Sequence, residues 1–267
     1  MRFALQLAYD GTDFAGWWRQ PDARTVAESF DVACARFGEP NARVVGVSRT
    51  DAGVHARCQV AHVDMARDYT ASRLLGILAT HLPSDLSCYA VAEVSPDWHA
   101  CYQARHKTYR YTIANGEIPD PFMARYAWRP PYRLDVTKLI SASSGIAGKR
   151  DWCGFVKRGE TRQSDGDLIR DIHRVAWSAH GDLLHCEVTG AGFTYRLVRS
   201  LVGAMVAVAH GTCRAQDLTE ALAGKTTSAS AQQAPACGLC LLSVCYDPEP
   251  TWVMSPSRNI PLNQDII

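Results

Sequence analysis

Nine consecutive residues, 48–56, bring together side chains that could form a reactive loop. They combine the cation of Arg49, a hydroxyl, the carboxylate of Asp51 and a turn at Gly53, between two valine-rich stretches typical of strands. The alternative is an ordinary hairpin loop, in which Asp51 and Gly53 make the turn and Arg49 is solvated. Such loops are common, so these nine residues by themselves leave both interpretations open.

A second group of reactive and charged side chains lies on a predicted strand, residues 105–113, which begins with Arg105. The alternation of a strand separates two sets, Lys107, Tyr109 and Tyr111 on one face and Thr108, Arg110 and Thr112 on the other. Cations on both faces beside tyrosines indicate a surface that meets phosphates and bases together. The alternative is a solvated edge strand whose charges oppose aggregation.

A predicted helix over residues 193–210 carries a third candidate, Arg199. Apolar residues cover most of the circumference of this helix, so we expect it to be buried. A buried guanidinium needs a partner, most naturally a carboxylate, unless its side chain reaches solvent at the helix edge.

The overall charge does not indicate a polyanionic partner, since the chain has 28 Lys and Arg residues and 27 Asp and Glu residues, for a formal net charge of +1. A nucleic acid would therefore need a local basic patch. Besides the 105–113 strand, a second basic stretch offers one, although most charge runs are only solvated faces. It consists of Lys149, Arg150, Lys157, Arg158 and Arg162.

We expect neither a signal peptide nor a membrane span, because residues 1–10 alternate and the longest uncharged apolar stretch, 200–209, is far shorter than a bilayer requires. Ten cysteines without a secretion signal indicate reduced thiols. Cys237 and Cys240 form a Cys-x-x-Cys pair without a second pair at suitable spacing, so two small core residues are favoured over a zinc site.

The first third of the chain predicts the order strand, helix, strand, strand, helix, strand, which is a ferredoxin-like arrangement. The expected strands are 3–9, 41–47, 58–64 and 86–94. One expected helix begins at Thr25, whose side chain can cap it, and the other begins at Thr70 or Ser72 and runs to about His81. Between them, the aromatic cluster of Phe14, Trp17 and Trp18 suits core or domain contacts, and any exposed member could stack on bases.

The remaining chain repeats an alternation of strands and helices without a close internal repeat. Its expected helices are 134–146, 193–210 and 216–222, and its expected strands after 105–113 are 169–177, 183–188 and 239–246. We therefore predict an α+β fold with halves 1–102 and 103–247, followed by a proline-rich tail, 248–267.

With these pieces in order, the chain resembles the tRNA pseudouridine synthase A family up to about Asp247. Six blocks carry the resemblance: residues 8–12 (AYDGT) with Phe14, Gly16 and Trp17; residues 49–56 (RTDAGVHA) continued by 59–62 (QVAH); Leu82-Pro83; Ala104-Arg105 with residues 108–111 (TYRY); Phe193 with Val198-Arg199 and Val202-Gly203; and residues 234–236 (APA) with Gly238-Leu239. Six blocks in sequence are far more specific than the Arg-Thr-Asp loop alone.

The resemblance implies two ferredoxin-like (RRM-like) halves, whose mainly antiparallel sheets meet at a central RNA-binding catalytic cleft. The implied activity is conversion of uridine to pseudouridine in the tRNA anticodon stem-loop, at uridines 38, 39 and 40. The family implies no organic cofactor, no metal, a homodimer and a cytoplasmic location.

The resemblance also implies roles for individual residues. Asp51 matches the catalytic aspartate, which can act as nucleophile or base, and Tyr109 matches the tyrosine that stacks under the target base and is a candidate for the proton at C5. Arg199 matches a helix arginine that would pair with Asp51 and keep it ionised. Arg49 matches the residue that takes the place of the flipped base. Arg105, Lys107 and Arg110 are the remaining candidate RNA contacts.

The sequence departs from the family pattern without removing these residues. Ser48 stands where glycine is usual, Trp18 where glutamine is usual, Cys240 where tyrosine is usual, and residues 149–152 alter a usual His-Asp-Phe run. Two other functions remain open: an RNA-binding module without catalysis, and a glycosidic hydrolase, which normally needs two carboxylates where the sequence offers one convincing candidate.

Overall fold

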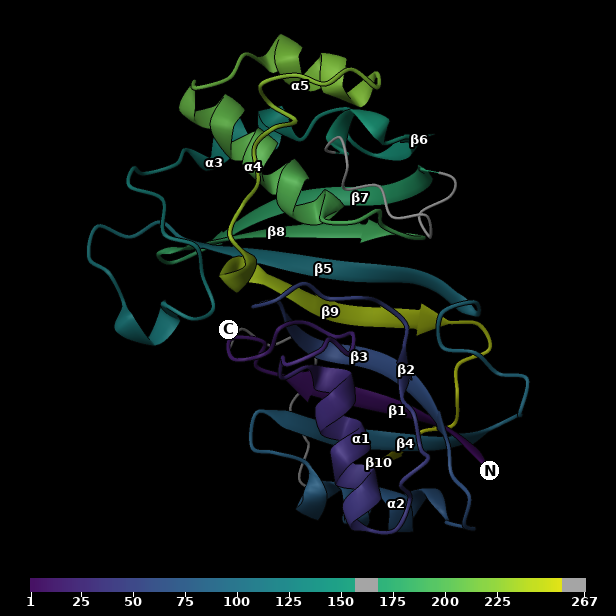
Figure 1. Ribbon diagram of the computed structural model, residues 1–267. Coiled ribbons are helices and arrows are strands. Elements are labelled where there is room, and N and C mark those ends of the chain that lie inside the picture. Colours follow the sequence, from purple (N-terminus) through teal and green to yellow (C-terminus); the bar gives the residue numbers. More distant parts are fainter. Residues whose placement is uncertain (157–167, 256–267) are drawn as a thin grey trace. The chain divides into compact units, whose positions relative to one another are not determined.

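A computed structural model describes residues 1–156 and 168–255, which form two compact units (Figure 1). Unit 1 contains Met1–Arg105 and residues 240–255, and unit 2 contains the described part of His106–Leu239. The predicted division placed residues 103–247 together, whereas 240–247 group with unit 1 here.

Unit 1 is built on a mostly antiparallel sheet with the strand order β10-β4-β1-β3-β9. A short β2 pairs with β3, and β9 is parallel to β3. The strands are β1 (Arg2–Tyr9), β2 (Val45–Gly46), β3 (His55–Asp64), β4 (Leu86–Val94), β9 (Leu239–Tyr246) and β10 (Val253–Met254). Phe3, Leu5 and Leu7 of the central strand β1 are fully buried, so this sheet contributes to the core of the unit.

Two helices of unit 1 lie next to one another, α1 (Val26–Arg36) and α2 (Ala71–His81), and α2 packs on β4 (Figure 1). Thr25 caps α1, as predicted, because its hydroxyl accepts from the Glu28 N–H at 3.3 Å. Thr70 caps α2 in the same way through the Arg73 N–H. The cap at Thr25 is confirmed, and of the two starts expected for the second helix the structure has the one at Thr70.

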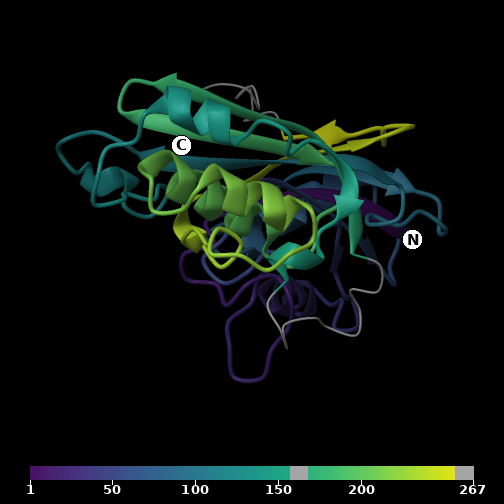
Figure 2. The same ribbon diagram turned by 90° about the horizontal axis from the view of Figure 1, so that it is seen from above.

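Unit 2 contains an antiparallel sheet with the strand order β5-β8-β7-β6. Its strands are β5 (Ala104–Ala114, beginning at the end of unit 1), β6 (Gly148–Asp151), β7 (Ile169–His180) and β8 (Leu183–Gly190). Its helices are α3 (Val136–Ala142), α4 (Leu197–His210) and α5 (Ala215–Leu222), with the 3-10 turns η1 (Pro121–Met123), η2 (Cys153–Phe155) and η3 (Ala236–Gly238). Helix α3 contacts both β7 and α4 (Figure 2).

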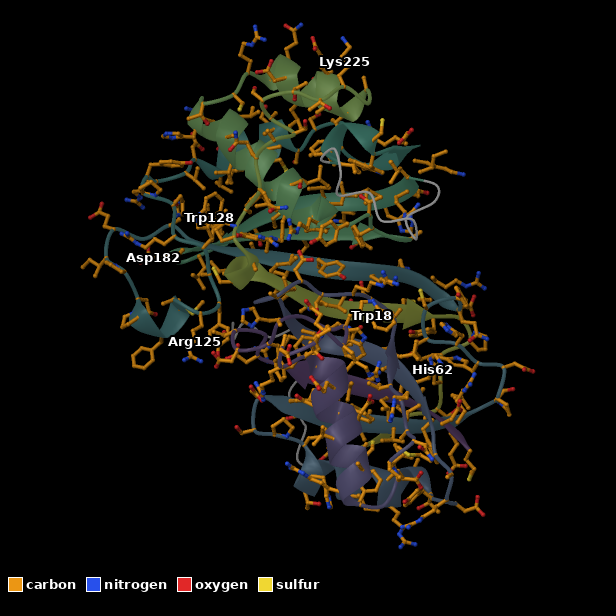
Figure 3. The ribbon with its side chains drawn as sticks, in the orientation of Figure 1. Trp18, His62, Arg125, Trp128, Asp182 and Lys225 are labelled. Atoms are coloured by element: carbon orange, nitrogen blue, oxygen red, sulfur yellow. The ribbon has the colours of Figure 1, made fainter. Side chains whose placement is uncertain are left out.

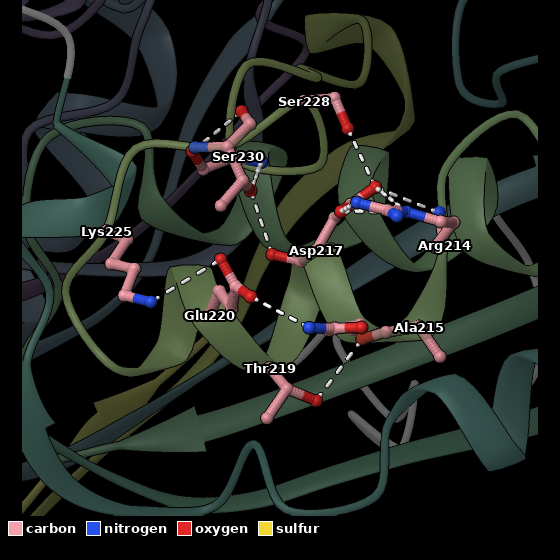
Figure 4. Close-up of polar contacts among 10 residues, drawn as sticks. Arg214, Ala215, Asp217, Thr219, Glu220, Lys225, Ser228 and Ser230 are labelled. Carbon is pink, nitrogen blue, oxygen red and sulfur yellow. Dashed lines mark hydrogen bonds and ion pairs between the residues drawn. The ribbon is translucent and has the colours of Figure 1, made fainter.

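Polar contacts join α5 to the segment after it (Figure 4). The Asp217 carboxylate accepts from the Arg214 guanidinium at 2.8 Å and from the Ser228 hydroxyl at 3.1 Å, and the Asp217 carbonyl accepts from the Thr227 hydroxyl. This network fixes the start of the segment that leads to Ala234 and the end of unit 2.

Several predicted boundaries were wrong. The strand expected at 41–47 is only β2, the strand expected from residue 58 begins at His55, and the helix expected from Phe193 begins at Leu197. The last difference arises because Arg196 has a left-handed backbone, with φ of 58°, which interrupts the helical path. The helix expected at 134–146 is the shorter α3, since Gly145 has φ of 77°.

The expected tail is not wholly without structure. Residues Val253 and Met254 pair with Val91 and Ala90 of β4, and the Ser255 N–H donates to the Tyr89 carbonyl at 3.0 Å. This added strand was not predicted, since a pairing of two residues has no readable periodicity. Residues 256–267 lie outside the described residues.

Candidate active site

The loop 48–56 is held against residues 9–17 by hydrogen bonds from several directions. The Trp17 N–H donates to the Thr50 carbonyl at 3.0 Å, and the Tyr9 and Thr50 hydroxyls lie 2.8 Å apart. The Gly53 N–H donates to the Phe14 carbonyl at 3.2 Å. The loop is therefore fixed at its middle and at its turn, which a solvated hairpin loop does not require.

Glycines allow the two segments to approach this closely. A Cβ on Gly16, whose φ is +101°, would lie 2.7 Å from the Thr50 carbonyl oxygen, and one on Gly11 would lie 2.0 Å from the Val54 carbonyl oxygen. Any side chain at either position would push the segments apart. The glycines of the 8–17 block thus serve the geometry of the loop that carries Asp51.

Within this fixed loop the side chains differ sharply in burial. Thr50 is buried, Asp51 is half-buried and Arg49 is exposed. The buried Thr50 hydroxyl anchors the loop, while its two charged neighbours, Arg49 and Asp51, lie nearer to solvent. The arrangement presents a carboxylate and a guanidinium from a rigid base, as a catalytic loop requires.

The loop begins on a side-chain contact made by Gln59 of β3. Its amide Nε2 donates to the Ser48 carbonyl at 2.7 Å and to the Tyr9 hydroxyl at 3.4 Å. Because the Ser48 group in this contact is the backbone carbonyl, glycine at this position could accept the same bond. The contact is therefore compatible with either residue.

The imidazole of His55, at the end of the loop, lies against the start of the 10–13 turn. Its Nδ1 accepts from the Gly11 N–H at 3.0 Å and lies 3.2 Å from the Asp10 carboxylate. Sequence reasoning did not single out this contact, because no local pattern links two residues 44 positions apart.

Tyr109 lies on β5 in unit 2, opposite Val188 of β8. Its ring is 5 % exposed and meets the Phe193 ring edge to face at a centroid distance of 5.1 Å. Lys107 and Tyr111, which were predicted on the same face, are also buried. The tyrosine ring is thus held at a set angle before any substrate arrives.

Arg110 points away from that face and forms an ion pair with Glu187 of β8, with 2.9 Å between Nη2 and Oε1. A phosphate bound by Arg110 would have to compete with this carboxylate. Arg105, at the start of β5, is largely exposed, and its guanidinium lies 3.7 Å from the Asp247 carboxylate in unit 1.

Arg199 of α4 is half-buried, rather than fully buried as the helix pattern predicted. Its Nε donates to the Ala234 carbonyl at 2.9 Å, and the Ala234 N–H donates back to the Arg199 carbonyl at 3.0 Å. These two hydrogen bonds hold the Arg199 backbone and the Nε side of its guanidinium against Ala234. The predicted pairing with Asp51, a residue of unit 1, stays a prediction.

The groups near Arg199 are kept neutral by their surroundings. Burial raises the pKa of the Tyr111 phenol, whose hydroxyl donates to the Pro235 carbonyl at 2.8 Å. Burial also raises the pKa of the Cys237 thiol, although Arg199 opposes the shift. Neither group therefore places a competing negative charge beside the guanidinium at neutral pH.

The second basic stretch is only partly visible. Lys149 and Arg150 lie on β6, and an Arg150 Nη2 donates to the Gly145 and Ala147 carbonyls. Lys157, Arg158 and Arg162 lie outside the described residues.

All ten cysteines are free thiols, and residues 1–156 and 168–255 contain no cluster of three or more metal-ligating side chains. No helix within these same ranges has the length and apolar character to cross a bilayer.

One contact beside Asp51 was not foreseen from the sequence: the Arg49 guanidinium carbon lies 4.8 Å from the centre of the Trp18 ring. Phe14 and Trp17 are buried, as expected for core residues, whereas Trp18 is 36 % exposed. No sequence periodicity indicates this contact, because residues 17 and 18 lie in a bend between β1 and α1.

The known proteins that are similar to this chain point to one family. A family model described as tRNA pseudouridine synthase matches residues 6–103 and 144–247. Among curated proteins, a tRNA pseudouridine synthase A of Shouchella clausii is 35% identical over 263 residues, covering 98% of this chain and 99% of the relative. Those of Thermosynechococcus vestitus and Limosilactobacillus fermentum are 36% and 34% identical, covering 93% and 92% of this chain and 87% and 96% of the relatives.

Among solved structures, a chain from a Cbf5-Nop10-Gar1 complex aligns with a TM-score of 0.35 and 12% identity, over 76% of this chain and 44% of that chain, a likeness too slight to bear on the fold. The family match and the full-length relatives bear on identity directly. The chain belongs to the tRNA pseudouridine synthase family and is an isomerase that forms pseudouridine in tRNA.

Proposed function

We propose that this enzyme converts uridines 38, 39 and 40 of the tRNA anticodon stem-loop to pseudouridine, with Asp51 as its catalytic carboxylate. The observation that carries the assignment of Asp51 is the tethering of its loop: the preceding residue, Thr50, is buried and bonded to both Tyr9 and Trp17. A reactive group must be held in place to within a fraction of an ångström, and this loop has the anchors for it.

The reaction exchanges one bond for another within the substrate. The bond from N1 to C1′ of the ribose breaks, the uracil turns, a bond from C5 to C1′ forms, and the proton on C5 is lost while N1 gains one. Nothing is oxidised or reduced overall, so the chemistry needs a nucleophile or base and a proton carrier. Asp51 supplies the first, acting on either the sugar or the base.

Tyr109 and Arg199 complete the proposed site from unit 2. The Tyr109 ring, set by Phe193, would stack under the target base with its hydroxyl near C5. Arg199, whose Nε is bonded to the Ala234 carbonyl, has further donors with which to pair with Asp51.

The remaining arginines and lysine would bind the RNA. Arg49, exposed beside Asp51, would fill the space left in the stack when the target base is flipped out. Arg105, Lys107 and Arg110 would contact the backbone phosphates.

We further propose the family architecture of two ferredoxin-like halves, residues 1–102 and 103–247, whose sheets meet at a central cleft. The sequence order β1-α1-β2-β3-α2-β4 and the sheet order β4-β1-β3-β2 in unit 1 support this for the first half. The tail is residues 248–267, and the enzyme acts in the cytoplasm as a homodimer.

The test is conversion of an unmodified tRNA transcript labelled with tritium at C5 of uridine. Bond formation at C5 releases the tritium, and nucleoside analysis of the product should show pseudouridine, with reverse-transcription mapping at positions 38, 39 and 40. Free uracil with abasic sites would instead indicate the hydrolase. Binding without any tritium release would indicate the RNA-binding module.

A further inference from the structure

Arg49 and Trp18 form a cation–π pair at the exposed side of the Asp51 loop. The guanidinium carbon lies 4.8 Å from the ring centre, within the range of about 6 Å at which a cation is attracted to an aromatic face. Trp18 is 36 % exposed, so the pair lies at the surface of unit 1, where Figure 3 labels the tryptophan.

The residues on both sides of Trp18 are fixed to the fold. The Trp17 ring is buried, its N–H donates to the Thr50 carbonyl, and its carbonyl accepts from the Ala27 N–H at the start of α1. Arg19 is held by Asp31, with 2.6 Å between Nε and Oδ2. The backbone under the Trp18 ring therefore has little freedom.

The backbone at Arg49 is joined to the backbone at Trp18 through their neighbours, Thr50 and Trp17. The Thr50 carbonyl accepts a hydrogen bond from the Trp17 N–H, and the Thr50 hydroxyl is hydrogen-bonded to the Tyr9 hydroxyl. This backbone bond therefore lies one residue from Arg49 and one residue from Trp18. An arginine side chain on an exposed loop otherwise samples many rotamers, and ordering it opposes binding. The ring limits that freedom before RNA arrives.

We infer that Trp18 is a positioning residue, which holds the Arg49 guanidinium beside the Asp51 loop so that it meets the RNA already oriented. This inference rests on the role proposed above for Arg49. The competing explanation is that Trp18 itself stacks on a nucleobase and acts without Arg49. The two differ in whether the effect of removing the ring depends on the arginine.

A double-mutant cycle separates them, using Trp18→Leu, Arg49→Ala and the double variant. Leucine keeps an apolar side chain and removes the aromatic face, and Trp18→Phe should restore most of the loss because it returns that face. We measure tRNA affinity by filter binding, single-turnover tritium release with saturating enzyme, and the melting temperature. Tyr102→Leu, which removes a ring that is 84 % exposed in the same unit, is the matched control.

We expect Trp18→Leu to weaken tRNA affinity or turnover about two- to fivefold, the range of an exposed cation–π pair, without change in melting temperature. In the Arg49→Ala background the same substitution should change either quantity by less than about 1.5-fold, and Tyr102→Leu should do nothing. An equal loss in both backgrounds, or no loss in either, overturns the inference. If Arg49→Ala alone has no effect, the proposed role of Arg49 fails first, and the inference fails with it.

Discussion

The loop that carries Asp51 is held by Tyr9, Phe14 and Trp17, which lie 33 to 41 residues before the positions that they contact. The anchoring hydroxyl and carbonyl belong to Thr50, whose burial no local pattern indicates. These contacts hold the loop beside the turn of residues 51–54, in which the Val54 N–H donates to the Asp51 carbonyl at 3.1 Å.

Tyr109 allows the ring and the hydroxyl to be tested separately. If its hydroxyl handles the C5 proton, Tyr109→Phe should lower the single-turnover rate about 100-fold or more with little change in tRNA affinity. Tyr109→Leu should weaken affinity as well, because the stacking ring is lost. Rates and binding constants measured side by side check this, and a fully active Tyr109→Phe variant would exclude the hydroxyl from proton transfer.

His62 of β3, labelled in Figure 3, gives stability a specific dependence on pH. Burial, and then the charges of His99 and Arg2, lower the pKa of His62 to about 4 from 6.5. In the unfolded chain His62 therefore binds a proton near pH 6.5, whereas in the folded chain it does so only near pH 4. Its stabilising contribution is complete above about pH 6.5 and is lost progressively as the pH falls towards 4.

The measurement is the free energy of urea unfolding between pH 7.5 and 4.5. His62→Asn keeps an acceptor for the Ala100 N–H, which donates to His62 Nδ1 at 3.3 Å, but does not titrate. The difference between the two proteins should therefore change in this window, by up to about 1.4 kcal/mol per pH unit. A constant difference across it would show that His62 titrates alike in both states.

Helix α4 positions Arg199 through a close approach of its backbone to the 232–234 segment. A Cβ on Gly203 would lie 2.9 Å from the Gln233 nitrogen and 3.0 Å from that of Ala234, the residue bonded to Arg199. Gly203→Ala should destabilise the protein by about 1–3 kcal/mol in urea unfolding and lower activity, since the segment must move.

Gly76 of α2 provides the matched control. A Cβ there meets nothing within 4 Å, so Gly76→Ala should stabilise the protein by about 0.5–1 kcal/mol and leave activity unchanged. Equal effects of the two substitutions would contradict the close approach at Gly203.

The elements that the sequence predicted best are those whose limits are set by local chemistry. The cap at Thr25 placed the start of α1, and hydrophobic runs placed β4 and β9 at their observed bounds. The start of α2 was narrowed only to Thr70 or Ser72. The errors have tertiary causes: Arg196 adopts a left-handed backbone, and β10 exists only because β4 offers it an edge. Local propensity carries no information about either.

At the scale of the whole molecule, a net charge of +1 means that tRNA must be bound by a local group of cations. Affinity should therefore fall as salt rises. Arg105→Ala should weaken binding and reduce the slope of log K against log salt by about one, whereas Arg133→Ala, which removes an exposed cation paired with Glu117, should not. Filter binding from 50 to 300 mM salt checks both, and a salt-independent constant would argue against the phosphate contacts.

The α+β class and the mainly antiparallel sheets followed from the order of strands and helices in the sequence. The grouping of residues 240–255 with unit 1 did not, because a strand returning from the far end of the chain has no local signature. Six blocks in the same order as in the family predicted the family, because such an ordered set is far more specific than any one block.

If Asp51 is the catalytic carboxylate, removing its charge should stop the reaction. The measurement is single-turnover release of tritium from C5-labelled tRNA by the Asp51→Asn and Asp51→Ala variants. Both variants should bind tRNA within about threefold of the unchanged enzyme and melt at the same temperature, while pseudouridine formation becomes undetectable. Pseudouridine formed at an undiminished rate by either variant would contradict the claim.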